Sequence, residues 1–386
     1  MPAELIREPV PDDADVPRGF PEGFGAGKEE RAATLVLVSL LGIAPKRLHA
    51  LAWAEGTASG CLAAIRSGAA GSQADGAFAR AADPSSIAAA ATALGARFVT
   101  PADAEYVRPL LDLLADPPIG LFVKGRPLTG MPDVVAVVGA RNCSSLGNEM
   151  AMDIGSALGS AGACVVSGAA RGIDAAAHRG ALAAGGTSIA VLGSGIDLPY
   201  PRGSAQLLER IAAVGAVVTE YAPGVKAEPF RFPARNRLVA ALSRALVVVE
   251  GAEGSGSMIS VEHALDLGRD VFAVPGTVTN PLAQVPLALI REGATLIRGA
   301  DDLLADLGLA ARLAVAPPPG LSDEERKIYE QMVEPLLPDA LARRAGISIP
   351  TAVTALVSLE MKHLVRAVGG RYERRLSAPP PPADPR

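Results

Sequence analysis

The sequence has little cysteine and no long hydrophobic run. Its three cysteines, Cys61, Cys143 and Cys164, are odd in number and form no C-x-x-C pair, which argues against a disulfide framework and against a zinc site. No apolar run approaches the roughly 18 residues of a membrane span. The first thirty residues carry eight acidic and three basic side chains, unlike a cleavable signal. We therefore expect a cytoplasmic protein with no membrane partner.

Motifs of catalysis are also missing. The chain has no G-x-x-x-x-G-K-[ST] loop for a nucleoside triphosphate, no G-x-S-x-G nucleophile elbow and no H-E-x-x-H zinc site. His49, His178, His263 and His363 are scattered, and we expect His178 to be a packed residue rather than a general base. The sequence therefore predicts no catalytic residue, no metal and no cofactor.

Excess positive charge is absent from the chain as a whole but present locally. The 386 residues have a net charge of -5, and the first thirty account for all of it. Residues 225–244 and residues 362–375 each carry a net charge of +4. Since local basic patches can bind polyanions, the acidic total does not exclude a nucleic-acid partner.

The composition suits a globular protein of two or three domains, because 49% of residues are apolar and 20% are charged. Residues 1–30 mix proline, glycine and acids without periodicity, which predicts a disordered tail. Residues 31–115 have helical spacing and predict a small helical domain. Within it, LLGIAPKRL (40–48) resembles a helix-hairpin-helix unit that binds DNA, although an ordinary turn between two packed helices is the favoured interpretation.

Short apolar runs alternate with helix-length segments across residues 130–310. Such runs predict buried parallel strands covered by helices on both faces, which is an α/β, doubly wound, mostly parallel and Rossmann-like fold. The seven expected strands are VVAVV (134–138), ACVV (163–166), SIAVL (188–192), AVVT (216–219), ALVVVE (245–250), VFAV (271–274) and ATLI (294–297).

Glycine-rich turns follow several of these strands, at the sheet edge where doubly wound proteins bind ligands. They are GARNCSSLG (139–147), SGAARGID (167–174) and EGAEGSGSMIS (250–260). None is G-x-G-x-x-G, which disfavours a dinucleotide. Because an arginine beside such a turn is costly to hold without a partner, we expect Arg141 and Arg171 to contact phosphate, while Asp174 is expected to cap a helix.

The segment FRFPARNR (230–237) places two aromatic rings among three arginines. Proteins that bind single strands stack bases on such rings and neutralise phosphates with such cations. The alternative is that a ring docks the loop onto the sheet. The predicted nucleic-acid contacts are Gly139, Arg141, Ser167, Gly168, Arg171, Arg231, Phe232, Arg235, Arg237, Ser255 and Gly256.

Many of these motifs occur together, in the same order, in one known family. VVGAR, SGAARGIDAAAHRGAL, AVLGSGIDLPYP, FPARNRLVAALS, VVVEGAEGSGSMISVEHAL and GRDVFAVPG resemble the DNA-processing protein A family, also called Smf or DprA, over residues 134 to about 307. The resemblance implies a non-enzymatic homodimer that binds single-stranded DNA, protects incoming DNA during natural transformation and helps load the recombinase RecA. It places Arg141, the turn with Ser167, Gly168 and Arg171, and the residues Phe232, Arg235 and Arg237 at the DNA.

The sequence departs from the family pattern at Gln284, Val285 and Pro286, which leaves open the contacts of that loop. Two other functions also remain open. GSGSMISVE loosely resembles a loop of nucleotide or phosphoribosyl hydrolases, although Glu262 falls too late and Ser260 occupies the expected position. The second open function is that of a purely structural RecA adaptor.

The C-terminal segment predicts a further small domain. Residues 321–376 show the order helix, helix, helix and β-ribbon, which is the order of a winged helix. Its third helix ends at Lys362 and carries no other basic residue, so contact with DNA and contact with protein are both open. Residues 377–386 are rich in proline and predict a disordered tail.

Overall fold

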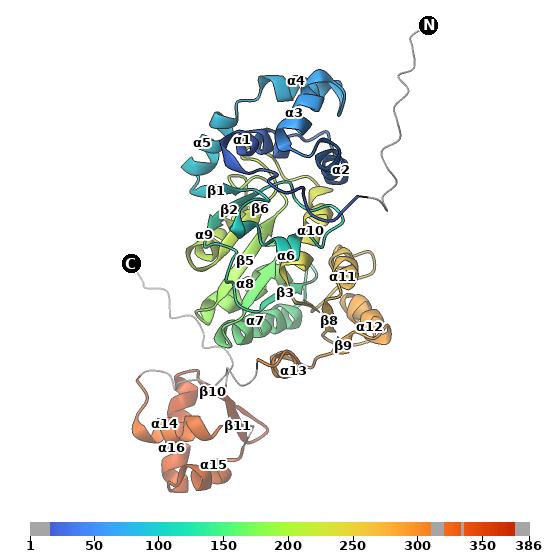
Figure 1. Ribbon diagram of the computed structural model, residues 1–386. Coiled ribbons are helices and arrows are strands. Elements are labelled where there is room, and N and C mark those ends of the chain that lie inside the picture. The colour runs from blue at the N-terminus through green and yellow to red at the C-terminus, as the bar shows by residue number, and fades with distance from the viewer. Residues whose placement is uncertain (1–15, 310–319, 333–335, 375–386) are drawn as a thin grey trace.

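The computed structural model describes residues 16–309, 320–332 and 336–374 (Figure 1). At its centre lies a nine-stranded sheet in the order β1-β2-β6-β5-β4-β3-β7-β8-β9. Strands β3 to β9 pair in parallel, whereas β1 and β2 add an antiparallel edge beside β6. The strands are β1 (Ala96–Val99), β2 (Leu121–Gly125), β3 (Val134–Val138), β4 (Cys164–Ser167), β5 (Thr187–Leu192), β6 (Ala216–Thr219), β7 (Ala245–Val248), β8 (Asp270–Ala273) and β9 (Thr295–Leu296).

All seven predicted strands are present, and the doubly wound, mostly parallel fold is confirmed. Strands β1 and β2 are additional to the prediction. Strand β1 falls inside the region predicted to be wholly helical, so that assignment was wrong for these four residues.

Helices cover both faces of the sheet, because alternate side chains of each strand point to opposite sides. Ile154, Ala176 and Leu303 pack with Val135 and Val165 on one face. The helices of this face are α7 (Ser145–Ser160), α8 (Ile173–Ala183), α9 (Ala205–Val214) and α13 (Ala300–Asp306). The other face carries α10 (Arg231–Leu242), α11 (Ser257–Asp266) and α12 (Gln284–Arg291), and the short α6 (Arg108–Leu111) packs on α10.

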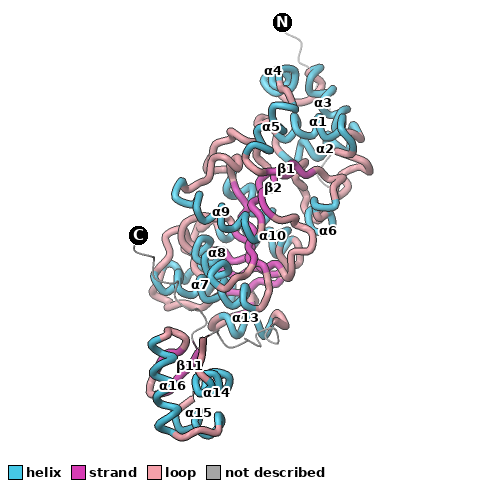
Figure 2. Tube along the Cα trace, turned by 90° about the vertical axis from the view of Figure 1, so that its left-hand side faces the viewer, coloured by secondary structure: helices cyan, strands magenta, loops and turns pink. Residues whose placement is uncertain are grey.

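Five N-terminal helices gather at the β1–β2 end of the sheet (Figure 1, Figure 2). They are α1 (Gly27–Val38), α2 (Pro45–Glu55), α3 (Ala58–Ser67), α4 (Gln73–Ala81) and α5 (Pro84–Ala93). Proline opens α2 and a left-handed Gly56 ends it, as the sequence pattern indicates. Buried Leu37 and Ile65 belong to the same apolar core as Val138 and Leu238. The helical unit therefore shares a core with the sheet and does not form a core of its own.

The prediction of a disordered tail over residues 1–30 was wrong for residues 16–30. Phe20 and Phe24 are both almost fully buried, with ring centroids 5.0 Å apart. The indole of Trp53 donates a hydrogen bond of 3.0 Å to the carbonyl of Gly19. Two buried aromatic rings hold this segment despite its polar composition. Residues 1–15 lie outside the described part of the chain.

The C-terminal unit has the predicted winged-helix order. It consists of α14 (Asp323–Gln331), α15 (Pro338–Ala345), α16 (Ile349–Met361), β10 (Val365–Val368) and β11 (Arg371–Arg374), around its own apolar core. Gly369 and Gly370 turn the ribbon with φ values of 58° and 79°. Lys362 donates 2.7 Å hydrogen bonds to both carboxylate oxygens of Glu325, which also caps α14, so this lysine ties two helices together. The predicted tail at 377–386 lies outside the described residues.

Candidate nucleic-acid interface

The strand order reverses beside β3, which lies between β4 and β7. At such a point two loops diverge from the carboxyl ends of neighbouring strands and leave a crevice for a ligand. A cavity of about 590 Å³ opens there. We call it the strand-end cavity; its walls are the loops that follow β3, β4 and β7, together with Tyr200 and the start of α10.

Most of the residues predicted to contact nucleic acid meet in this cavity, although they come from distant parts of the chain. Those that line it are Gly139, Arg141, Gly168, Phe232, Arg235, Ser255 and Gly256. Arg171 lines a small hollow beside it, together with Arg141, Gly168, Phe232 and Arg235.

Arg235 is the most deeply placed cation of the strand-end cavity. Its side chain is buried, yet among the described residues no carboxylate forms an ion pair with it. Its guanidinium donates to the carbonyl of Val191 and, over 3.0 Å, to Oδ1 of Asn236. Burial lowers the pKa of Arg235 to about 10, so the group keeps its charge at neutral pH. A buried cation without an ion pair is costly and favours a bound anion.

The carboxylate of Asp174 interacts electrostatically with Arg235 without forming an ion pair with it. Burial raises the pKa of Asp174, and the charge of Arg235 acts in the opposite direction. Its Oδ2 accepts a 3.3 Å hydrogen bond from the backbone N–H of Ala170, and Gly172 rather than Asp174 takes the cap position of α8. The carboxyl therefore holds the glycine-rich turn from within the helix, which corrects the predicted cap.

Two aromatic rings and a second arginine form the mouth of the cavity. The guanidinium carbon of Arg141 lies 4.7 Å from the ring centroid of Phe232. The ring of Tyr200, which is half exposed, lies 5.2 Å from the same ring at an angle of 43°. Arg141 is exposed, and no described carboxylate pairs with it or with Arg171. Flat π surfaces and unpaired cations thus lie within one hollow.

The turn after β3 does not leave its helix terminus open to an external anion. Glu250, which follows β7, accepts 2.8 Å and 2.6 Å hydrogen bonds from the backbone N–H and hydroxyl of Ser144, the cap of α7. The backbone donors at this helix start are thus partly satisfied by the protein. Within this turn, Arg141 supplies a charged side chain that forms no ion pair with a described carboxylate.

The loop after β7 is held by the segment that departs from the family pattern. Oε1 of Gln284 accepts a 3.2 Å hydrogen bond from the N–H of Glu253, and the N–H of Val285 donates 2.9 Å to the carbonyl of Gly251. These bonds fix the loop that presents Ser255 to the cavity. The departing residues therefore support the wall instead of lining it.

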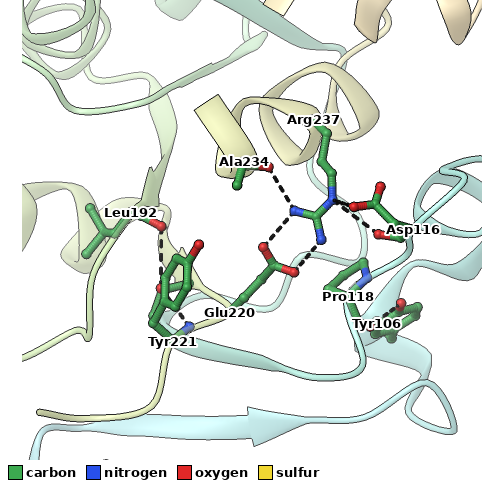
Figure 3. Close-up of polar contacts among 9 residues, drawn as sticks. Tyr106, Asp116, Pro118, Leu192, Glu220, Tyr221, Ala234 and Arg237 are labelled. Carbon is green, nitrogen blue, oxygen red and sulfur yellow. Dashed lines mark hydrogen bonds and ion pairs between the residues drawn. The ribbon is translucent and has the colours of Figure 1, made fainter. Parts of the chain in front are cut away.

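Arg237 lies outside the cavity, in contrast to the prediction. Its guanidinium donates 2.6 Å and 2.5 Å hydrogen bonds to Glu220 and lies 3.1 Å from Asp116 (Figure 3). Although burial opposes the charge, these two carboxylates raise the pKa of Arg237. With each of its three guanidinium nitrogens hydrogen-bonded and the side chain buried, Arg237 ties α10 to the segment before β2.

Arg231 and Ser167 also have protein partners. The guanidinium of Arg231 donates to the carbonyl of Lys226, lies 3.2 Å from Glu228 and stacks against Phe230 and Tyr221. The hydroxyl of Ser167, fully buried, donates 2.6 Å to the carbonyl of Val137. These contacts stabilise the fold around the strand-end cavity, which neither residue lines.

Few of the side chains that a hydrolase would use lie in the strand-end cavity. Glu262 is exposed and does not line the strand-end cavity, whereas Ser260 does. His178 is buried behind the sheet, with its ring Nδ1 2.7 Å from the hydroxyl of Ser188. Across the described ranges, no group of three or more His, Cys, Asp or Glu side chains is placed to hold a metal ion.

Comparison with known proteins agrees with this architecture. The family model for DNA recombination-mediator protein A matches residues 97–308, and the DprA winged helix domain matches residues 312–371. The chain belongs to the DNA recombination-mediator protein A family.

Individual relatives resemble most of the chain. A putative DNA processing protein DprA of Mycobacterium tuberculosis is 38% identical over 302 residues, which covers 72% of this chain and 77% of the relative. Protein Smf of Escherichia coli is 36% identical over 285 residues, which covers 71% and 76%. The crystal structure of DNA processing protein A from Streptococcus pneumoniae superposes with a TM-score of 0.56 at 37% identity, covering 60% of this chain and 81% of that one.

The structure adds residues to the site of this DprA family member that sequence reasoning missed. Tyr200, Asn142 and Asn236 all line the strand-end cavity. Tyr200 follows the third predicted strand in GSGIDLPYP, so its place at the carboxyl edge of the sheet was a usable signal. No helix in the described parts of this protein is long and apolar enough to cross a membrane.

Proposed function

We propose that this protein binds single-stranded DNA in the strand-end cavity and does so without catalysing a reaction. The observation that carries the proposal is Arg235, a buried guanidinium that lines the cavity and forms no ion pair with a carboxylate of the described residues. Arg141 and Arg171 add two further cations without ion pairs beside it. Three such charges in one hollow suit successive phosphates of a polynucleotide.

The aromatic rings at the mouth favour a single strand over a duplex. Phe232 and Tyr200 can stack only on a base whose face is free, and a base within a duplex is already stacked on its neighbours. Among the described residues that line the cavity, arginines, rings and small side chains predominate over the two amides, Asn142 and Asn236. Binding should therefore depend weakly on sequence.

The family membership supports a role in recombination. We propose that the bound strand is DNA entering during natural transformation, that the protein protects this strand, and that it helps to load RecA as a homodimer. Loading of a recombinase requires the strand to be held mainly by its backbone, so that the edges of its bases remain free to pair. A site made of arginines and ring faces meets that requirement.

The experiment is equilibrium binding of a labelled oligonucleotide, as a single strand and as a duplex of equal length, at moderate salt. We expect the single strand to bind more tightly. An AMP-hydrolysis assay on the same preparation distinguishes the hydrolase alternative, and we expect no product. Equal affinity for both oligonucleotides, or steady release of a free base, would overturn the proposal.

A further inference from the structure

A second cavity lies on the other side of the FRFPARNR segment. It has a volume of about 380 Å³ and separates the turn between α1 and α2 from the start of α10. We call it the hairpin cavity; Leu41, Ile43, Pro45, Tyr221, Phe230 and Arg231 are among its walls. Phe232 and Pro233 line the strand-end cavity instead. A single turn of chain therefore separates the two cavities.

The walls of the hairpin cavity suit a flat, uncharged ring. The exposed ring of Phe230 and the ring of Tyr221 lie 5.1 Å and 5.2 Å from the guanidinium carbon of Arg231. Arg231 is already paired with Glu228, and Glu220 is already paired with Arg237. Since the charged groups are engaged, the cavity offers π faces and aliphatic side chains, and it lacks the free cations that a phosphate needs.

The opposite wall is formed before any ligand binds. Gly42, in the turn between α1 and α2, lies so close to the carboxylate of Asp75 that an added Cβ would overlap it. Asp75 is itself buried and locked in a capping box with Ser72 at the start of α4. This packing fixes the turn and places Leu41, which is more than half exposed, at the cavity mouth.

We propose that the hairpin cavity takes one nucleobase of the strand whose phosphates lie in the strand-end cavity. The inference rests on the proposed function and deepens it, because it assigns a base-binding subsite to the helical unit. The two cavities share the turn at residues 230–233, so a strand passing over that turn can place a base on each side of it. Aromatic rings among apolar walls and adjacency to unpaired arginines favour a base over an aliphatic ligand.

The test is an abasic scan of a short single-stranded oligonucleotide, performed with the parent protein and with Phe230→Ala. We expect abasic sites at two positions to weaken binding to the parent about tenfold each, the value of a stacked base, with one position at the strand-end cavity and the other at the hairpin cavity. In Phe230→Ala only the penalty of the hairpin-cavity position should disappear, because the variant has already lost that contact. Phe78→Ala is the matched control, since Phe78 is an exposed ring on α4 that lines neither cavity.

A second variant tests the opposite wall. Leu41→Glu places a charge at the mouth of the hairpin cavity, and it should weaken single-strand binding and remove the same abasic penalty. Leu265→Glu changes an equally exposed leucine on α11 and should leave both unchanged. If every abasic penalty of the parent persists undiminished in Phe230→Ala and Leu41→Glu, the inference is overturned, and the cavity would then suit an apolar side chain of a protein partner.

The outcomes separate this inference from the proposed function. Salt-dependent binding without any coupling between an abasic position and Phe230 would leave the strand-end cavity as the binding site and reject the hairpin cavity. Absence of single-strand binding by the parent would reject both.

Discussion

Gly168 lies directly against the guanidinium of Arg235, so closely that a Cβ at residue 168 would overlap Nη2 and Cζ. The position of Arg235, on α10, therefore requires a glycine at residue 168, after β4. Only a residue without a side chain lets Arg235 reach the carbonyl of Val191 and face the strand-end cavity at the same time.

Gly168→Ala should consequently weaken single-strand binding about tenfold, which is the loss expected for one hydrogen bond to a charged group. The displaced guanidinium should also lower the free energy of unfolding by about 1–3 kcal/mol, as overpacking does. Gly256→Ala is the control, because this glycine also lines the cavity but has open space around it and an ordinary φ of -62°. Equal affinities for the two variants, measured on folded protein, would show that the position of Arg235 is irrelevant.

The aromatic pair predicts a separation of binding from folding. Phe232→Ala should weaken single-strand binding about tenfold by removing a stacking surface. Because the ring is only partly buried, the variant should lose less than the roughly 3–5 kcal/mol of a core phenylalanine. Melting temperature and affinity, both measured on this variant, decide between the two roles.

Tyr200→Ala provides an independent test of the same surface. Since its ring contacts Phe232, the double variant should lose less affinity than the sum of the two single losses. If Phe232→Ala sharply lowers the melting temperature while its folded fraction binds with the affinity of the parent, Phe232 is instead a packing residue.

Arg237 should behave in the opposite way to Arg235. Arg237→Met leaves the partly buried carboxylates of Glu220 and Asp116 without their partner, and it should cost about 3 kcal/mol in the free energy of unfolding. Adding Glu220→Gln should restore part of that loss, because it removes one uncompensated charge. Denaturant titration of the three proteins measures this effect. If Arg237→Met is as stable as the parent but binds DNA more weakly, Arg237 contacts DNA and its role is not structural.

His178 should make the protein less stable in mild acid. The hydroxyl of Ser188 donates to the carbonyl of Val165, so the His178 Nδ1–H donates to Ser188, and Nε2 is buried without a partner. Burial lowers the pKa of His178 to about 3. Below pH 6.5 the unfolded chain binds a proton that the folded protein does not, so stability falls as pH falls, by about 1.4 kcal/mol per pH unit.

Urea titrations between pH 7.5 and pH 4.5 measure this slope. His178→Gln removes the titrating group, so its stability relative to the parent should improve steadily as the pH falls through this range. A constant difference between the two proteins at every pH would show that His178 does not titrate on unfolding.

The sequence predicted the sheet well because its buried strands are short β-branched runs between helix-length segments. Strand β1 was missed because Ala96–Val99 follows an alanine-rich helix and carries Arg97 within it, so it does not form a continuous apolar run. It lies at the edge of the sheet, where pairing with β2 rather than an intrinsic pattern makes it a strand.

The arginines of α10 show what sequence cannot supply. Arg235 and Arg237 are two residues apart in one motif, but two residues turn an α-helix by about 200°, so they point to nearly opposite sides. The partners that engage Arg237 come from residues 116 and 220, which only the fold brings together. The types of these residues thus predicted the cluster, while burial and ion pairing distinguished Arg235, which lines the cavity, from Arg237, which is paired within the fold.

The central claim is that unpaired arginines of the strand-end cavity contact DNA phosphates. Single-strand affinity measured across a series of salt concentrations tests it most directly, with Arg298→Ala as the control because Arg298 is exposed and pairs with Asp302. We predict that log affinity falls linearly with log salt and that Arg141→Ala reduces the slope by about 0.7, the value per phosphate for a single strand. An Arg141→Ala protein with the slope and affinity of the parent and of Arg298→Ala would contradict the claim.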